Sequence, residues 1–131
     1  MGDLSIFLRE NKKVKENFKY APTKSLCDKN GNPVEWEFKH LSSAEDRLIR
    51  ESCVLGGKFN NGLYVRKMLA ACVVYPNLYD KQLQDSYGVY TPEELLECLV
   101  DCPSEWYELN IHIQKELGFM SLEEAVEEAK N

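Results

Sequence analysis

The segment from Leu63 to Tyr75 constrains the fold more than any other part of this 131-residue chain. Its pattern is helical, and from Met68 onward it is almost wholly apolar until Pro76 stops it. A helix that is apolar on all sides must be covered from several directions. The run is also far shorter than the roughly 20 residues that span a bilayer. We therefore expect a buried central helix rather than a membrane span.

Capping signals predict further helices around this segment. Ser42 can accept a hydrogen bond from the backbone of Glu45 while the glutamate reaches back, which is a capping box. The helix it begins should run to about Leu55 and end at Gly56-Gly57, followed by a mobile loop from Lys58 to Gly62. Other caps, prolines and glycines predict helices over residues 4–11, 80–87, 91–99, 103–117 and 121–129.

One β-hairpin is predicted before the helical part. Asn30-Gly31 tolerates the positive φ angles of a tight turn, and it lies between the segments Tyr20–Leu26 and Val34–His40. In the second segment Trp36 and Phe38 should face the core with Val34, while the intervening charged residues face solvent.

These elements predict a single domain over residues 1–131, of the α+β class and mostly α-helical. A chain of this length can bury roughly two-thirds of its unfolded surface, so one core suffices. We expect a helical arm over residues 1–16, a β-hairpin over residues 18–40 and a helical part over residues 43–131. The hairpin should pack on a small helical bundle built around Met68 to Tyr75.

The composition favours a cytoplasmic protein. The N-terminus leads into mixed charges rather than an apolar stretch, so no secretory signal is expected. The five cysteines are irregularly spaced and odd in number, which fits reduced thiols better than a disulfide framework.

The charge distribution disfavours nucleic acid as the main ligand. The net charge is −6, with acidic residues concentrated after residue 90 and basic residues near the N-terminus. Electrostatic binding to phosphates needs a large basic face. A basic N-terminal arm nevertheless leaves open a regulatory module that binds nucleic acid, with affinity that falls steeply with salt. The local basic residues are Lys12, Lys13, Lys15, Lys19 and Lys24.

Chemical motifs are weak throughout the chain. The only histidines, His40 and His112, have no nucleophile signature beside them. Cys98 and Cys102 are four residues apart, but no second Cys/His pair completes a zinc site. Gly56-Gly57 is followed by a lysine without phosphate-loop spacing, and paired glutamates are typical of solvated helix faces. We assign no catalytic, cofactor-binding or metal-binding residue and predict that the protein is not an enzyme.

Three stretches carry a resemblance to a known family. They are the strand after the Asn-Gly turn, the central run with its proline, and a helix end: Val34–Phe38, Ala70–Leu78 and Leu83–Val89. Together they resemble the XkdN-like tail assembly chaperones of Gram-positive phages and PBSX-like prophages, and the likeness covers most of the chain. The short connection from Gly56 to Gly62 departs from the longer charged insertion expected in many relatives.

The resemblance implies a non-catalytic tail assembly chaperone in the bacterial cytoplasm. Such a protein binds the tape measure protein, keeps it soluble and helps to recruit tail tube subunits. A long helical tape measure exposes apolar stripes before the tube surrounds it, and exposed stripes self-associate. A homo-oligomer of the chaperone is plausible for a protein that coats a long partner, and no cofactor is implied.

The last predicted helix offers a candidate partner-binding stripe. Its apolar residues recur at helical spacing beside paired glutamates, and an amphipathic helix in a groove is a common mode of recognition. The same pattern fits docking on the protein's own core. The stripe consists of Leu122, Ala125, Val126 and Ala129.

The residues Ala129-Lys130-Asn131 suggest a programmed frameshift. They can be encoded by a slippery A AAA AAC heptamer, and such slippage is characteristic of tail chaperone genes. A gene sequence that cannot re-pair after slippage would exclude the hypothesis.

The main alternative function is a structural tail or head-tail completion protein that is retained in the virion. Its presence in purified particles would favour that role over a chaperone.

Overall fold

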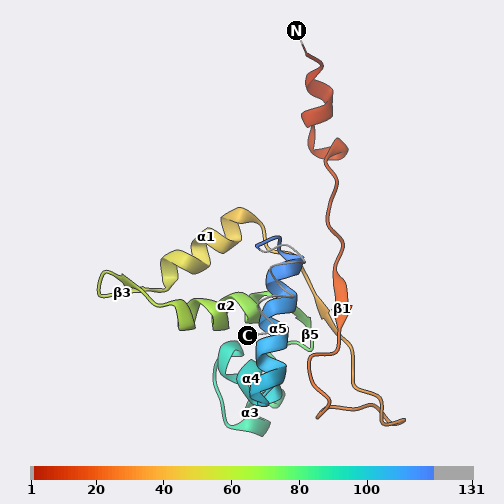
Figure 1. Ribbon diagram of the computed structural model, residues 1–131, viewed down its shortest axis with the longest axis vertical. Helices are drawn as coiled ribbons and strands as arrows, with labels where there is room; N and C mark the ends of the chain where they lie inside the picture. The colour runs from red at the N-terminus through yellow and green to blue at the C-terminus, as the bar shows by residue number, and fades with distance from the viewer. Residues whose placement is uncertain (1, 120–131) are drawn as a thin grey trace.

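The computed structural model describes residues 2–119, which form a mostly helical α+β fold (Figure 1). Two short 3-10 helices, η1 and η2, precede a three-stranded and a two-stranded sheet and the α-helices. Within this part of the chain, no helix is long and apolar enough to cross a membrane. The elements are η1 (Leu4–Phe7), η2 (Arg9–Asn11), β1 (Phe18–Tyr20), β2 (Trp36–Phe38), α1 (Ser43–Ser52), β3 (Val54–Leu55), β4 (Lys58–Phe59), α2 (Asn61–Cys72), β5 (Val73–Tyr75), α3 (Lys81–Tyr87), α4 (Pro92–Leu99) and α5 (Pro103–Glu116).

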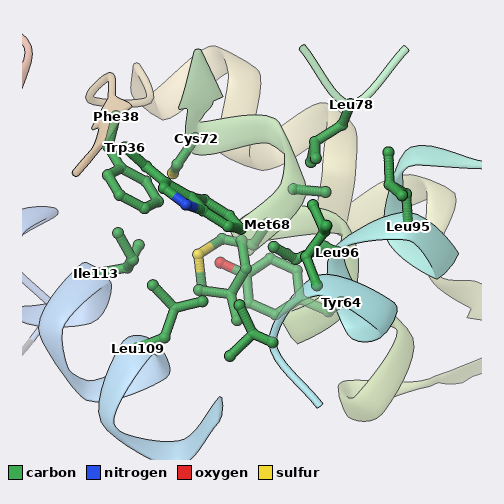
Figure 2. Packing of buried hydrophobic residues seen from close by; sticks show 14 of the residues in the cluster. Trp36, Phe38, Tyr64, Met68, Cys72, Leu78, Leu95, Leu96, Leu109 and Ile113 are labelled. Carbon is green, nitrogen blue, oxygen red and sulfur yellow. The ribbon is translucent and has the colours of Figure 1, made fainter. Parts of the chain in front are cut away.

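Helix α2 is the centre of the fold, as its all-round apolar pattern predicted. It contacts α1, α4, α5 and β5. Figure 2 shows Met68 of α2 among Trp36 from the sheet, Leu96 from α4 and Leu109 from α5. All four of these side chains are at most 1% exposed. Burial of this kind is the main source of stability for a domain of this size.

The sheet order is β1-β2-β5, with β2 in the middle and both pairs antiparallel. Trp36 and Phe38 are buried, whereas Glu37 between them is partly exposed. The predicted inward face of this strand is therefore confirmed. Phe18 pairs with Phe38 in register and stacks on its ring at 5.4 Å between centroids.

The turn of the predicted hairpin forms, but the ladder lies further from it than expected. Asp28 Oδ1 accepts hydrogen bonds from the backbone N–H groups of Asn30 (2.8 Å) and Asn32 (3.0 Å), and Gly31 has φ +81°. Beyond this turn, residues 21–25 leave the ladder, so the paired strands are shorter than the predicted segments 20–26 and 34–40.

The side chain of Glu105 explains why residues 21–25 leave the sheet. Its Oε1 accepts from Thr23 Oγ1 and its Oε2 accepts from the backbone N–H of Lys24, both at 2.8 Å. Thr23 is only 2% exposed. This clamp holds the connection against the first turn of α5 instead of in the ladder.

The predicted capping box is present, but α1 ends earlier than predicted. Ser42 Oγ accepts from the backbone N–H of Glu45, and Glu45 Oε1 accepts from the backbone N–H of Ser42. The helix ends at Ser52 instead of about Leu55. The structure therefore corrects the predicted C-terminus of this helix.

The prediction of a mobile loop at residues 58–62 is also wrong. Lys58 and Phe59 form β4, which pairs with β3 across Gly56-Gly57. These glycines have φ +57° and +79°, and two successive positive φ angles suit a tight hairpin turn. Asn60 then caps α2 by accepting from the backbone N–H of Leu63 at 3.0 Å.

The central helix ends at Cys72 instead of Tyr75. Val73–Tyr75 is a strand that pairs with β2, and the Tyr75–Pro76 peptide bond is cis. β-branched and aromatic residues fit a pleated surface well, and β2 offers a second edge. Pairing with β2 is therefore favoured over an extension of helix α2 through these residues.

The N-terminal arm, residues 2–16, extends away from the body (Figure 1). The predicted helix over residues 4–11 is replaced by η1 and η2, with Asp3 capping η1. An isolated α-helix of eight residues is marginal in water, and this arm has no buried residue to support one.

The remaining predicted helices within the described range are confirmed. Asp80 caps α3, Thr91 caps α4, and Gly88 ends α3 with φ +68°. Helix α5 begins with Pro103 and is followed by Gly118, as expected. The predicted helix over residues 121–129 lies outside the described residues.

Candidate interaction surface

The two histidines are packing rings in an aromatic layer between the sheet and α5. The Phe18 ring lies 5.3 Å from the His40 ring and 5.7 Å from the His112 ring, between centroids. Tyr20 stacks on His112 at 4.1 Å. Burial lowers the pKa of His112, so this ring is held neutral for stacking.

The cysteines divide into buried thiols and thiols that are partly or fully exposed. Cys53 and Cys72 are buried, and burial raises the pKa of Cys72 to about 12, so it remains a weakly nucleophilic thiol. Cys102 precedes α5, and its hydrogen bonding with Ser104, 3.3 Å from its sulfur, lowers its pKa. Among residues 2–119, no group of three or more His, Cys, Asp or Glu residues is arranged to hold a metal ion.

A more promising feature is the outer edge of the three-stranded sheet. β5 pairs with β2 on one side only and ends the sheet. Three apolar or aromatic side chains on this segment remain exposed: Val74 by 43%, Tyr75 by 59% and Tyr79 by 77%. A strand edge that no other described strand pairs with, and that carries exposed aromatic rings, is a site where another chain can add.

A groove of about 480 Å³ adjoins this edge. Tyr75 forms one wall and Leu83 of α3 is half-buried at its side. We call this groove, together with Val74 and Tyr79, the edge surface. The groove is lined by Tyr75, Asn77, Asp80, Gln82, Leu83 and Ser86.

Local hydrogen bonds fix the turn that shapes the edge surface. Asn77 Oδ1 accepts from the backbone N–H of Tyr79 at 3.0 Å, and Asp80 Oδ1 accepts from that of Leu83 at 2.8 Å. Leu78 is 2% exposed and anchors the turn in the core, while its carbonyl accepts from Gln84 Nε2 at 2.8 Å. The exposed tyrosines therefore stand on a well-connected support, which lowers the entropic cost of binding.

The structure brings the quoted stretches Ala70–Leu78 and Leu83–Val89 together at this surface. The predicted binding stripe of Leu122, Ala125, Val126 and Ala129 lies outside the described residues. The sequence reasoning missed the edge surface because it placed Tyr75 at the end of a helix. The run Val73-Val74-Tyr75 before a proline was the available signal for an edge strand.

One comparison with known proteins identifies the family of this chain. The model of the phage XkdN-like tail assembly chaperone proteins matches residues 4–130. Among solved structures, the crystal structure of the protein YqbN is similar with a TM-score of 0.82 at 20% identity, over 92% of this chain and 99% of that one. A search of curated proteins finds no match.

A structural likeness at 20% sequence identity supports the fold. The match to the family model supports the family assignment. The matched region includes the N-terminal arm, the sheet, the edge surface and α5. This chain belongs to the phage XkdN-like tail assembly chaperone family.

Proposed function

We propose that this protein binds the tape measure protein during phage tail assembly, keeps it soluble and helps to recruit tail tube subunits. The observation that carries the proposal is the edge surface. It combines exposed aromatic rings, a groove and an unpaired strand edge on one rigid support.

The chemistry of this surface suits a reversible cover for apolar stripes. Tyr75 and Tyr79 present apolar ring faces together with hydroxyl groups that stay hydrated. Tyrosine also buries a large area at low conformational entropy cost. An amphipathic helix of the tape measure protein can place its apolar face against these rings and its smaller side chains in the groove.

The role is proposed to be non-catalytic and to take place in the host cytoplasm. The histidines serve as stacking rings, and the buried Cys72 thiol has a raised pKa. Binding, rather than bond making, is the chemistry that this surface supports.

The apolar stripe of Leu122, Ala125, Val126 and Ala129 remains a second proposed contact. It is separable from the edge surface, because substitutions can be made in either one alone. Docking of the stripe on the protein's own core would instead show as a loss of stability.

Co-expression with the tape measure protein tests the proposal. We expect the intact chain to raise the soluble fraction of the tape measure protein and to co-purify with it. The variant Tyr75→Ser/Tyr79→Ser should reduce both, because it removes two exposed rings without opening the core. The variant Leu122→Ser/Val126→Ser tests the stripe in the same assay.

Tyr90→Ser is the matched control, since Tyr90 is 83% exposed but does not line the groove. It should behave as the unchanged chain. A tape measure protein that is equally soluble alone and forms no complex would contradict the proposal. Recovery of this chain from purified virions would instead favour a structural tail or head-tail completion protein.

A further inference from the structure

A surface of mixed apolar and basic character lies where the β3–β4 hairpin meets α1 and α2. Val54 and Phe59 are register partners on this hairpin, and partners in a ladder project from the same face. They are 49% and 45% exposed. The hairpin projects from the body on the side away from β1 and β5 (Figure 1). Residues 2–119 therefore leave about half of each of these two side chains uncovered.

Ring contacts connect the hairpin to the end of the described chain. The Phe59 ring lies 5.7 Å from the Tyr64 ring, between centroids. The guanidinium carbon of Arg50 lies 4.3 Å from the centroid of the Tyr64 ring and 5.8 Å from that of the Phe119 ring. Phe119 is 46% exposed. We call this continuous surface the hairpin cradle, and it consists of Arg50, Val54, Phe59, Tyr64 and Phe119.

Asp46 holds the centre of the hairpin cradle in place. Its Oδ2 accepts a hydrogen bond from Arg50 Nε at 2.8 Å, and its Oδ1 accepts one from the Tyr64 hydroxyl. Burial, followed by this hydrogen bond, raises the pKa of Tyr64, so the hydroxyl keeps its proton and remains a donor. A surface that is fixed before binding loses little conformational freedom when another segment covers it.

A polar hollow of about 380 Å³ opens beside the hairpin cradle. Its lining includes the carboxamides of Asn61, Asn110 and Gln114 together with the Arg50 guanidinium. Gln114 Nε2 donates to Asn110 Oδ1 at 2.8 Å. Within the described residues, the amide nitrogens of Asn61 and Asn110 donate no hydrogen bond. Amide and guanidinium donors of this kind suit a carboxylate.

Unpaired lysines border the hairpin cradle. Arg50 is paired with Asp46, whereas Lys58 of β4 and Lys67 of α2 form no ion pair among residues 2–119. Lys67 Nζ donates to Ser52 Oγ at 3.3 Å, where α1 ends. The surroundings of the hairpin are therefore locally positive in a chain whose net charge is −6.

The chain leaves α5 at the hairpin cradle. The backbone N–H of Phe119 donates to the carbonyl of Gln114 at 2.9 Å, and that of Gly118 donates to the carbonyl of Lys115 at 3.1 Å. Gly118 has φ +84°. This pair of bonds is the Schellman motif, which ends a helix and turns the chain. Residues 120–131 therefore continue from a point that is fixed beside Arg50.

The sequence that follows Phe119 complements this surface. Residues 120–131 lie outside the described residues, and they contain four glutamates, one lysine and the predicted binding stripe. Twelve residues span about 18 Å as a helix and about 40 Å when extended. Either length suffices to cross the successive ring contacts from Phe119 to Phe59.

We propose that residues 120–131 fold back onto the hairpin cradle of the same chain in the free protein. The apolar stripe covers Val54 and Phe59. The glutamates lie beside Lys58 and Lys67 and reach the carboxamides of the hollow. A short tether gives an effective concentration on the order of millimolar, which favours the same chain over a free partner as the occupant.

This docking regulates the stripe that we propose as a second contact for the tape measure protein. A stripe covered in the free chain does not associate with other apolar surfaces. The tape measure protein must displace the hairpin cradle before it reaches the stripe, so the two compete. Only this competition rests on the proposed function, because the docking itself needs the purified chain alone.

Carbodiimide cross-linking of the purified full chain tests the docking. The reagent joins a lysine amine to a carboxylate in contact with it, and mass spectrometry of the peptides identifies the pair. We expect links from Lys58 or Lys67 to the glutamates within residues 123–128. An equal mixture of isotope-labelled and unlabelled chains distinguishes the occupants, since links within one chain join peptides of the same isotope.

A glutamate-specific protease measures how often the segment leaves the hairpin cradle. Val54→Ser/Phe59→Ser should raise the rate of cleavage within residues 123–128 roughly tenfold, because apolar burial is lost and cleavage follows the population of the open segment. Tyr79→Ser/Tyr90→Ser is the matched control. These tyrosines are 77% and 83% exposed and lie outside the hairpin cradle, so the control should be cleaved like the unchanged chain.

The charge contribution is tested at an exposed turn. Lys58→Glu should raise the same cleavage rate roughly twofold to threefold, because attraction to the glutamates becomes repulsion. Lys29→Glu is the matched control, since Lys29 is also exposed and lies in a hairpin turn. Equal changes in the two variants would trace the effect to net charge and overturn the docking.

Other outcomes separate this inference from the proposed function. The docking is overturned if Lys58 and Lys67 form no links to residues 123–128, or if every such link joins two different chains. Unchanged cleavage of a folded Val54→Ser/Phe59→Ser variant overturns it as well, and Lys58→Glu carries the test if that variant unfolds. A chain that shows the links but leaves the tape measure protein insoluble contradicts the proposed function alone.

Discussion

Two apolar segments of this chain, residues 68–72 and residues 4–8, lie in opposite environments. Met68, Leu69 and Cys72 are at most 1% exposed, because α1, α4, α5 and the sheet surround α2. Leu4 and Phe7 are 73% and 77% exposed, because no element among residues 2–119 covers them. Apolar residues thus indicate a need for burial, and the surrounding elements decide whether the same copy meets it.

The largest effect on the free energy of unfolding should come from the core that surrounds the buried segment. Leu96 of α4 is fully buried in the cluster around α2. Leu96→Ala should lower the free energy of unfolding by about 2–5 kcal/mol, from lost burial and the cavity left behind. Urea unfolding followed by circular dichroism measures this change. A loss below about 1 kcal/mol would show that the core relaxes around the missing side chain.

A smaller effect should come from the clamp that joins the connection after β1 to α5. Glu105 accepts hydrogen bonds from Thr23 and Lys24, and Thr23 is buried. Glu105→Ala leaves the Thr23 hydroxyl without this acceptor, so we expect a loss of about 1–3 kcal/mol in unfolding free energy.

Glu108→Ala on the same helix is the control for the clamp. Glu108 is exposed, and its removal should change stability by no more than about 0.5 kcal/mol. Equal losses for the two variants would assign the effect to helix charge or propensity rather than to the clamp.

The helix caps were predictable from the sequence because they depend on neighbouring residues. Ser42 with Glu45, Asp80 and Thr91 all act within one turn of the chain. Strands β3 and β4 pair locally across Gly56-Gly57, and they were missed because these glycines were interpreted as a helix end. Strand β5 was missed because it pairs with β2, which is distant in the sequence. Val73–Tyr75 continues a helical pattern locally but finds β2 in space.

The same distinction explains the result for the candidate site. A stripe at helical spacing is visible in any sequence, whereas the edge surface requires the sheet to place Tyr75 beside α3. The arm was predicted as a helix from its spacing and cap. Without a covering surface it forms 3-10 turns instead.

The capping box of α1 provides an intermediate test, at a site that is local and partly exposed. Ser42→Ala removes the acceptor for the backbone N–H of Glu45. We expect a loss of about 0.5–2 kcal/mol in unfolding free energy, as for other cap removals. Chemical denaturation at neutral pH measures it, and an unchanged stability would show that water replaces the cap.

The same site predicts a pH dependence. Hydrogen bonding from Lys39, together with the backbone of Ser42, holds the pKa of Glu45 below its ordinary value of 4.5. A lowered folded-state pKa adds stability above pH 4.5 that is lost as the pH falls through the folded-state value. Glu45→Gln should therefore flatten the acid side of the stability profile. If the free energy of unfolding of Glu45→Gln falls with pH below 4.5 as steeply as that of the unchanged chain, this role of Glu45 is contradicted.

The smallest effect on the free energy of unfolding should come from the exposed segment, residues 4–8. Leu8→Ala is the same chemical change as Leu96→Ala, but Leu8 is 51% exposed and belongs to an arm without buried residues. At low protein concentration it should alter the unfolding free energy by no more than about 0.5 kcal/mol. A large loss at low concentration would mean that the arm is covered by its own copy.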